Sequence, residues 1–147
     1  MELLKLSPYL VAAGIAWLLA QTIKFLLATG IHDRQAWRML YQSGRMPSAH
    51  TATMVALTTA IAVYDGISSG LFALAALVTA IVIYDAVMVR RSSGEQGMAL
   101  RKLLRNSKEH AHEPLPYLAL GHRPLEVAGG AVLGVLVGLA VAFFITK

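Results

Sequence analysis

The chain has 147 residues, of which 56% are hydrophobic and 14% charged, and its mean hydropathy is +0.60. Since a soluble domain carries about 25% charged residues, this composition excludes an ordinary soluble protein and predicts a single membrane domain over 1–147. In so apolar a chain, the formal net charge of +5 favours lipid headgroups over nucleic acid as partners. The lack of cysteine excludes disulfides and thiolate metal sites.

Four apolar segments follow one another along the chain. They span about residues 7–29, 48–64, 71–89 and 125–145. A bilayer core accommodates about 17–25 residues of helix, and helices are required because lipid cannot satisfy open backbone groups. We therefore expect an all-α integral membrane bundle with about four transmembrane helices plus short interfacial helices. The first segment lacks a cationic start and a small-residue cleavage site, so we expect a retained span rather than a signal peptide.

Small residues recur at every fourth position inside the spans, which lets membrane helices approach closely. These residues are Ala12, Ala16 and Ala20; Ala76 and Ala80; and Gly130, Gly134 and Gly138. Between the third and fourth spans, segment 95–104 has leucines on one face and basic residues elsewhere, which is typical of an amphipathic helix in the membrane interface. These patterns concern packing and placement rather than chemistry.

The first candidate functional residues occur near the end of the first span and the start of the second. Lys24 either snorkels to the interface or points inward at a phosphate, and we favour the second. The second span opens with Pro47-Ser48-Ala49-His50-Thr51-Ala52. Ser48 suits an N-cap, and a helix N-terminus presents free N–H groups to an anion. His50 stands where it can protonate a leaving group, although a capped helix with an interfacial histidine is the alternative.

The third span ends in Tyr84-Asp85, followed by Arg90 and Arg91. Basic residues at this point are a common stop signal for a span and suit a helix C-terminus. Asp85 lies within the apolar run, where an ionisable group is costly. We therefore expect Asp85 to pair with an arginine or lysine.

The fourth span opens with Gly121-His122-Arg123-Pro124-Leu125-Glu126. His122 and Glu126 are four residues apart and share a face in a helical first turn. A carboxylate that holds an imidazole in one tautomer makes its other nitrogen a better nucleophile; the alternative is a local pair at the helix start. Upstream, His110-Ala111-His112-Glu113 resembles a metal cluster but has no partner motif, and we predict no metal there.

Alternation of the four spans places the ends that carry these residues on one side of the membrane, here called side B. Side A holds both termini and has 2 basic residues, Lys5 and Lys147, whereas side B has the other 11 of the 13. The positive-inside rule then puts side B in the cytoplasm. We expect a multi-pass protein of the cell (inner) membrane whose site faces the cytoplasm.

Four blocks of the sequence together resemble the divergent branch of the type 2 phosphatidic acid phosphatase (PAP2) superfamily. The blocks are Arg45-Met46-Pro47-Ser48-Ala49-His50-Thr51-Ala52, Tyr84-Asp85-Ala86-Val87-Met88-Val89-Arg90-Arg91, Gly94-Glu95-Gln96 and Leu120-Gly121-His122-Arg123-Pro124-Leu125-Glu126-Val127. They occur in the order of that branch, between about Gln21 and Gly134. The wider superfamily includes membrane lipid phosphate phosphatases and vanadium haloperoxidases, whose members share one metal-independent phosphate site.

The resemblance implies a role for each matching residue. Lys24 falls in the lysine-containing block, although the Arg-Pro that ends that block is not recognisable here. Pro47, Ser48 and His50 match the second block, with Ala49 in place of glycine. His122 matches the nucleophilic histidine of the third block, and Glu126 stands where an aspartate is usual. The superfamily places an arginine six residues before this histidine, where this chain has Pro116, so Arg90 or Arg91 is expected to supply the charge.

These inferences predict a membrane phosphatase that hydrolyses a lipid-linked phosphate monoester or pyrophosphate through a phosphohistidine, without metal or cofactor. The substrate is expected to be a phospholipid or polyprenyl phosphate, and self-association is left open. The catalytic residues are His122, His50 and Glu126, and Asp85 supports the site. The phosphate is bound by Lys24, Arg45, Ser48, Ala49, Arg90 and Arg91.

Two other classes of protein fit the same residues. A non-catalytic lipid-phosphate binder or transport-associated protein would keep the basic pocket without turnover. A metal-dependent phosphotransferase would use Asp85 and Glu95 and would be sensitive to a chelator.

Overall fold

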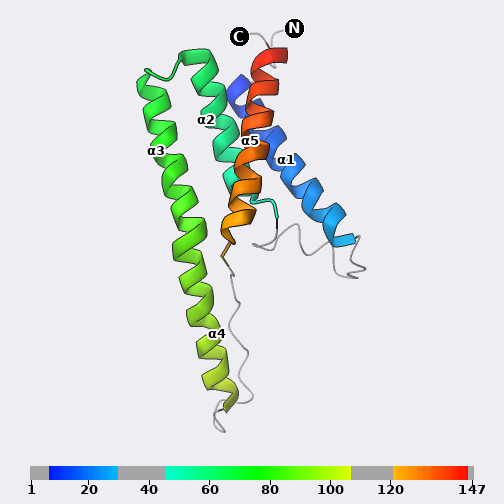
Figure 1. The fold of residues 1–147 in the computed structure, drawn as a ribbon, viewed down its shortest axis with the longest axis vertical. Helices are drawn as coiled ribbons and strands as arrows, with labels where there is room; N and C mark the ends of the chain where they lie inside the picture. The colour runs from blue at the N-terminus through cyan, green and yellow to red at the C-terminus, as the bar shows by residue number, and fades with distance from the viewer. Residues whose placement is uncertain (1–6, 30–45, 107–120, 146–147) are drawn as a thin grey trace.

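The computed structural model describes residues 7–29, 46–106 and 121–145, and these residues confirm the all-helical architecture (Figure 1). The elements are α1 (Pro8–Thr29), α2 (Ala49–Asp65), α3 (Gly70–Tyr84), a π-helical segment (Asp85–Val89), α4 (Arg90–Asn106) and α5 (Pro124–Phe144). The helices within Pro8–Leu27, Gly70–Asn106 and Pro124–Phe144 are long and apolar enough to cross a membrane. The four apolar segments of the sequence thus correspond to α1, α2, α3 with the π segment, and α5.

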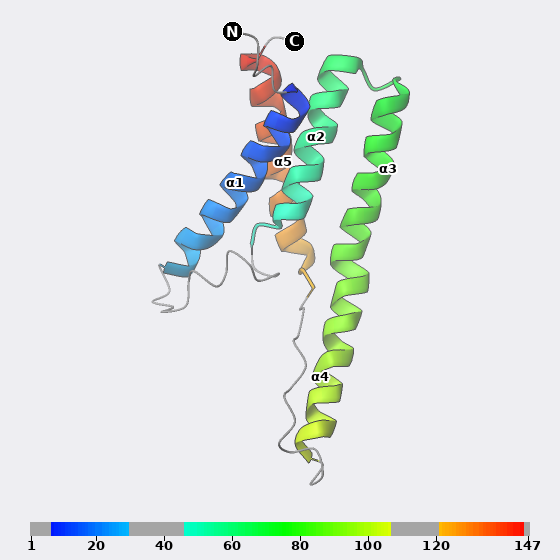
Figure 2. The ribbon, with the colours of Figure 1, turned by 180° about the vertical axis from the view of Figure 1, so that it is seen from behind.

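The shortest of these four segments, α2, lies at the centre of the bundle. It has 17 residues, about 25 Å of helix, slightly less than the roughly 30 Å hydrocarbon core. It packs against α1, α3 and α5, and Figures 1 and 2 show it between α3 on one side and α1 and α5 on the other. Because its neighbours shield it from lipid, α2 tolerates four threonines that would be costly on a lipid-facing helix.

Small residues form the interfaces of α1 and α5 with α2, as the four-residue spacing predicts. The prediction is wrong for α3, where Ala80 is exposed and the buried residues are Ala75 and Thr79. Every fourth residue of α1 and α2 is a fully buried alanine: Ala12, Ala16 and Ala20, and Ala52, Ala56 and Ala60. On α5, a Cβ added to Gly134 would lie 2.6 Å from the Ala52 carbonyl oxygen. Glycine is therefore required here because the two backbones are nearly in contact.

Tyrosines join the helices at the side A end of the bundle, where α1 begins and α5 ends (Figures 1 and 2). Tyr9 of α1 donates a hydrogen bond to the carboxylate of Asp65, the last residue of α2. Tyr64 packs edge-to-face on Tyr9 and donates to the Val141 carbonyl of α5 at 3.3 Å. Three helices are thereby joined at side A, which leaves their opposite ends to form the site.

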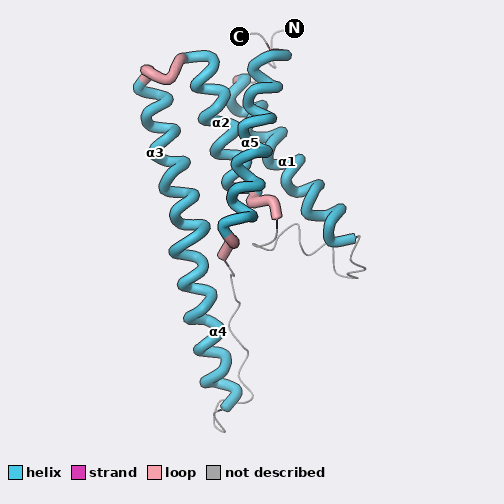
Figure 3. Tube along the Cα trace, in the orientation of Figure 1, coloured by secondary structure: helices cyan, strands magenta, loops and turns pink. Residues whose placement is uncertain are grey.

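The amphipathic helix expected at 95–104 is present, but it begins earlier and continues from the third span. The π segment and α4 follow α3 without a break, giving 37 helical residues in line (Figures 1 and 3). At 1.5 Å per residue this rod is about 55 Å long, well beyond the roughly 30 Å of hydrocarbon. Most of α4 therefore projects from the membrane on side B.

Candidate functional site

The candidate site lies at the side B end of the bundle, where α2 and α5 begin and α3 passes into the π segment. Figures 1 and 2 show these ends at the same level, opposite the start of α1 and the end of α5. This arrangement is the one that alternation of the spans predicts. The site is therefore assembled from residues more than seventy positions apart in the sequence.

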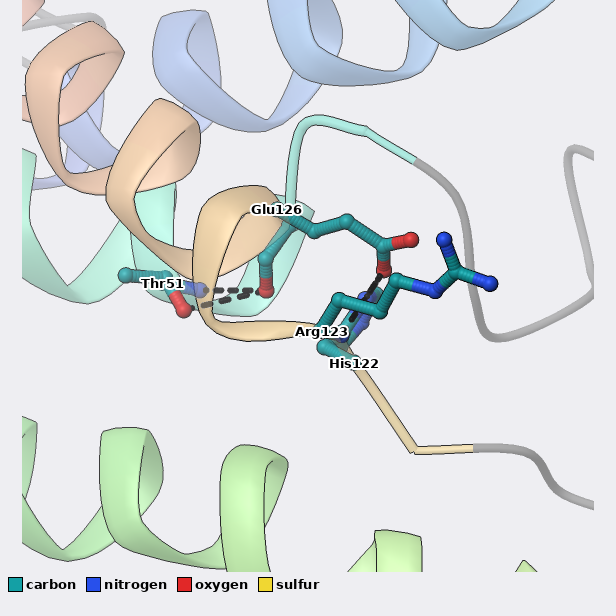
Figure 4. Close-up of polar contacts among 5 residues, drawn as sticks. Thr51, His122, Arg123 and Glu126 are labelled. Atoms are coloured by element: carbon teal, nitrogen blue, oxygen red, sulfur yellow. Dashed lines mark hydrogen bonds and ion pairs between the residues drawn. The ribbon is translucent and has the colours of Figure 1, made fainter.

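The start of α5 holds a buried histidine–carboxylate pair. His122 Nδ1 lies 2.8 Å from Glu126 Oε2, and the two side chains are 3% and 17% exposed. The same oxygen accepts a 3.3 Å hydrogen bond from the Arg123 backbone N–H, so the glutamate also satisfies an open donor of the first turn (Figure 4). When Glu126 is ionised, Nδ1 is the protonated nitrogen and Nε2 carries the lone pair. The expected i,i+4 pair is thus present in the geometry that a nucleophilic Nε2 requires.

The start of α2 is capped by Ser48, as expected, and is fixed directly to α5. The Ser48 hydroxyl accepts from the Thr51 N–H at 3.4 Å and from the Thr51 hydroxyl at 3.0 Å, and both side chains are fully buried (Figure 4). The Ser48 N–H donates to the Glu126 carbonyl at 2.9 Å. This proximity depends on Gly130, because a Cβ there would lie 2.5 Å from the Ser48 carbonyl oxygen.

These contacts change the role expected of Ser48. Its amide is engaged by Glu126, so it is not free to donate to a phosphate oxygen in this arrangement. Its hydroxyl accepts from Thr51 and keeps its own O–H as a donor. The Ala49 N–H is in the first turn of α2, where amides have no intrahelical acceptor. Of the two amides expected to bind phosphate, that of Ser48 instead joins the two helix starts, and that of Ala49 stays a prediction.

Arg90 follows the π segment directly and pairs with the acidic residue that begins it. Arg90 Nε lies 2.6 Å from Asp85 Oδ2, so the intramembrane carboxylate has the basic partner that the sequence predicts. Arg91 instead pairs with Glu95 at 3.1 Å through side chains that are 61% and 60% exposed. The structure thus separates two adjacent arginines, and Arg90 is the one directed to the site.

Lys24 and His50 complete the cluster. Lys24 is 7% exposed and attracts the Glu126 carboxylate electrostatically, so it points inward rather than snorkelling to the surface. His50 is exposed at the start of α2. The charges of Arg90, Lys24 and Asp85 and the His122 ring all act electrostatically on the His50 ring, so each of the four membrane segments contributes a group to the surroundings of the candidate site.

Some expected residues lie outside the described part of the chain, and others were not anticipated. Arg45 and the His110-Ala111-His112-Glu113 stretch belong to the former. Among the described residues, no group of three or more His, Asp or Glu side chains is arranged to hold a metal ion. The sequence does not predict two contacts of the site. One is the contact of Thr51 with Ser48, and the other is the hydrogen bond that the Ala86 carbonyl accepts from the His122 N–H at 3.0 Å. Neither has a sequence signal, since one is a hydroxyl beside a cap and the other a backbone atom.

Comparison with known proteins identifies the family of the chain. The model of the Divergent PAP2 family matches residues 6–137. The chain is also similar to the uncharacterized membrane protein YuiD of Bacillus subtilis (strain 168), with 34% identity over 157 aligned residues that cover 98% of this chain and 99% of that protein. No solved structure matches the chain. The chain therefore belongs to the Divergent PAP2 family, and the resemblance drawn from its four sequence blocks is confirmed.

Proposed function

We propose that this member of the Divergent PAP2 family is a membrane phosphatase that removes phosphate from a lipid-linked monoester or pyrophosphate. The observation that carries the proposal is the His122–Glu126 pair, 2.8 Å apart and buried at the start of α5. A buried histidine held through Nδ1 by a carboxylate has its Nε2 lone pair fixed in direction. The cations around it are the groups that a phosphate dianion attracts.

The first half of the reaction transfers phosphate to the protein. The Nε2 lone pair of His122 forms an N–P bond while the P–O bond to the lipid breaks. Its electron pair stays on the lipid oxygen, which takes a proton from His50. His50 suits this role because it is exposed at the mouth of α2, where a leaving group can depart. The Glu126 carboxylate stabilises the positive charge that develops on the His122 ring.

The second half of the reaction hydrolyses the phosphohistidine and returns both histidines to their starting states. Neutral His50 takes a proton from water, the water oxygen forms a P–O bond, and the N–P bond breaks with its electron pair returning to Nε2. The products are inorganic phosphate and a lipid alcohol, or a lipid monophosphate from a pyrophosphate. Every proton and electron pair is accounted for by the two histidines, the lipid and one water, without a metal.

Lys24, Arg90 and the Ala49 amide stabilise the negative charge on the phosphoryl group during its transfer. Such preorganised donors usually provide the largest part of phosphoryl-transfer catalysis, about 10²–10³ in rate for one donor. Asp85 holds Arg90 in place through its 2.6 Å contact. Lys24 is buried at the same end of the bundle, which supports a role for its charge in binding an incoming phosphate.

One observation favours a second candidate, a lipid-phosphate binder without turnover. The His122 side chain is 3% exposed, so a phosphate reaches Nε2 only after a neighbouring group moves. If that movement does not occur, the cations bind the headgroup and the histidine stays covered. The metal-dependent alternative has less support, because Asp85 and Glu95 are each paired with an arginine of their own helix segment.

A single experiment separates the three candidates. Purified protein in detergent is incubated with phosphatidic acid, polyprenyl phosphate or polyprenyl pyrophosphate, with and without EDTA. Both the release of phosphate and the binding of the lipid are measured. We expect EDTA-insensitive release that is lost in His122→Ala and retained in Glu95→Gln. Binding without release identifies the binder, and release abolished by EDTA or by Glu95→Gln identifies the metal-dependent enzyme.

A further inference from the structure

The π segment between α3 and α4 interrupts the regular backbone ladder at one carbonyl. In an α-helix the Arg90 N–H would donate to the carbonyl four residues earlier, that of Ala86. Here it donates to Asp85, five residues earlier. Such one-turn π-bulges are rare and are frequent at functional sites. The consequence is that the Ala86 carbonyl is released from its α-helical partner.

The released carbonyl accepts a hydrogen bond from the His122 backbone N–H at 3.0 Å. The preceding residue, Gly121, lies against the same part of the helix, since a Cβ added to it would be 2.4 Å from the Arg91 nitrogen and 2.8 Å from the Arg90 carbonyl carbon. Two consecutive residues therefore contact the π segment and the first residues of α4 immediately before α5 begins. The segment that carries His122 is docked on the third span by its backbone.

The wider turn also brings Asp85 and Arg90 together. Residues five apart on an α-helix are rotated by about 140° and do not share a face. In the π segment the same two side chains form a 2.6 Å ion pair. The backbone that holds the His122 main chain thus also directs the guanidinium of Arg90 to the site.

We propose that the π segment Asp85–Val89 is the positioning element of this site, which fixes His122 relative to Arg90 through the Ala86 carbonyl. Its catalytic consequence rests on the proposed phosphatase function, whereas its structural part does not. A misplacement of about 1 Å costs on the order of 100-fold in rate when groups must meet in one geometry. The π segment is the feature that prevents such a misplacement.

The decisive variant is deletion of Met88, whose side chain is 54% exposed. Removing the extra residue of a π-bulge converts it to α-helix without turning the flanking segments away from their neighbours. Arg90 then stands four residues after Asp85, a spacing that preserves the ion pair, and its N–H donates to the Asp85 carbonyl as in a regular α-helix. Arg91 now stands four residues after Ala86, so its N–H donates to the Ala86 carbonyl and competes with His122. The deletion thus removes only the acceptor of His122, and Met88→Ala is the control with unchanged length.

Two measurements are made on both variants. Hydrogen exchange of the His122 amide is expected to be about tenfold faster in the deletion than in Met88→Ala, since a hydrogen bond is lost. The Val127 amide, which donates to Arg123 within α5, is expected to be unchanged. In the phosphate-release assay we expect kcat to fall about 100-fold in the deletion with KM within about threefold of that of the control.

Each outcome decides a separate point. Equal His122 exchange in the two variants overturns the inference, whatever the activity. Faster exchange with unchanged kcat overturns the positioning role. Faster exchange in a protein that releases no phosphate even as wild type supports the structural part and refutes the phosphatase function instead. As an independent check, Gly121→Ala is expected to reproduce the deletion, whereas Gly70→Ala, which meets nothing within 4 Å, has no such effect.

Discussion

Replacing Glu126 by glutamine tests whether this residue acts in the chemistry or only at the start of α5. The carboxylate accepts from His122 Nδ1 at 2.8 Å and from the Arg123 N–H at 3.3 Å. Glutamine is nearly isosteric and its amide oxygen can keep the Arg123 contact. The backbone carbonyl that accepts from Ser48 is unaffected. The fold should therefore survive, with a loss of stability below about 1 kcal/mol.

The catalytic loss should be much larger, because the His122 ring becomes positive as it attacks phosphorus. Opposite unit charges about 4 Å apart attract by about 4 kcal/mol at an effective dielectric constant of about 20. That value suits a pair whose side chains are 3% and 17% exposed. Removing the negative charge then lowers the rate by roughly a thousandfold. A glutamine that turns its NH₂ toward Nδ1 would add to the loss by favouring the wrong tautomer.

The assay is phosphate release from a short-chain lipid phosphate in detergent, with kcat, KM and the unfolding temperature measured for each variant. Glu126→Gln should lower kcat far more than it changes KM, and Glu126→Asp should retain part of the activity. Glu95→Gln, which removes an exposed carboxylate, is the matched control. A Glu126→Gln protein that keeps kcat within about threefold of wild type, or that only loses stability, would refute the orienting role.

Three further predictions concern the histidines, the orientation and the packing. His122→Ala should abolish phosphate release, and wild-type turnover in this variant would eliminate the phosphohistidine mechanism. His50→Ala should lower the rate of phosphate release most for substrates with poor leaving groups. Cysteines introduced at 107–114 should resist impermeant thiol reagents in intact cells if side B is cytoplasmic, and ready labelling there would reverse the orientation. Gly134→Ala should destabilise the protein by about 1–3 kcal/mol because its Cβ meets the Ala52 carbonyl. Gly14→Ala is the control, since a Cβ there meets nothing within 4 Å. Equal thermal stability of the two variants would contradict the close packing of α2 and α5.

Local spacing was sufficient to predict two features of the site. The i,i+4 relation of His122 and Glu126 needs only a helical first turn, and that turn is favoured by Pro124 and by the glutamate itself. The Ser48 cap likewise depends on residues within three positions. Interactions this short do not require the rest of the fold, so a pattern in the sequence is enough to identify them.

Contacts between helices could not be predicted in this way. The Ser48 amide is engaged by Glu126 because α2 and α5 approach closely at Gly130, and nothing in the Pro-Ser-Ala-His block indicates that approach. Arg90 and Arg91 are adjacent and chemically alike. Only their rotation around the helix directs one to the site and the other to Glu95 on the surface.

The sequence by itself determined the membrane class, the four apolar segments and the side of the membrane on which the polar residues gather, because hydrophobic length and alternation of spans are properties of the chain alone. The tertiary structure decided which of those residues meet. The π segment is the clearest case, since one extra residue in a helical turn leaves composition and hydropathy unchanged but releases the Ala86 carbonyl to hold His122. That hydrogen bond joins residues 36 positions apart, and it forms only because α5 starts beside the end of α3.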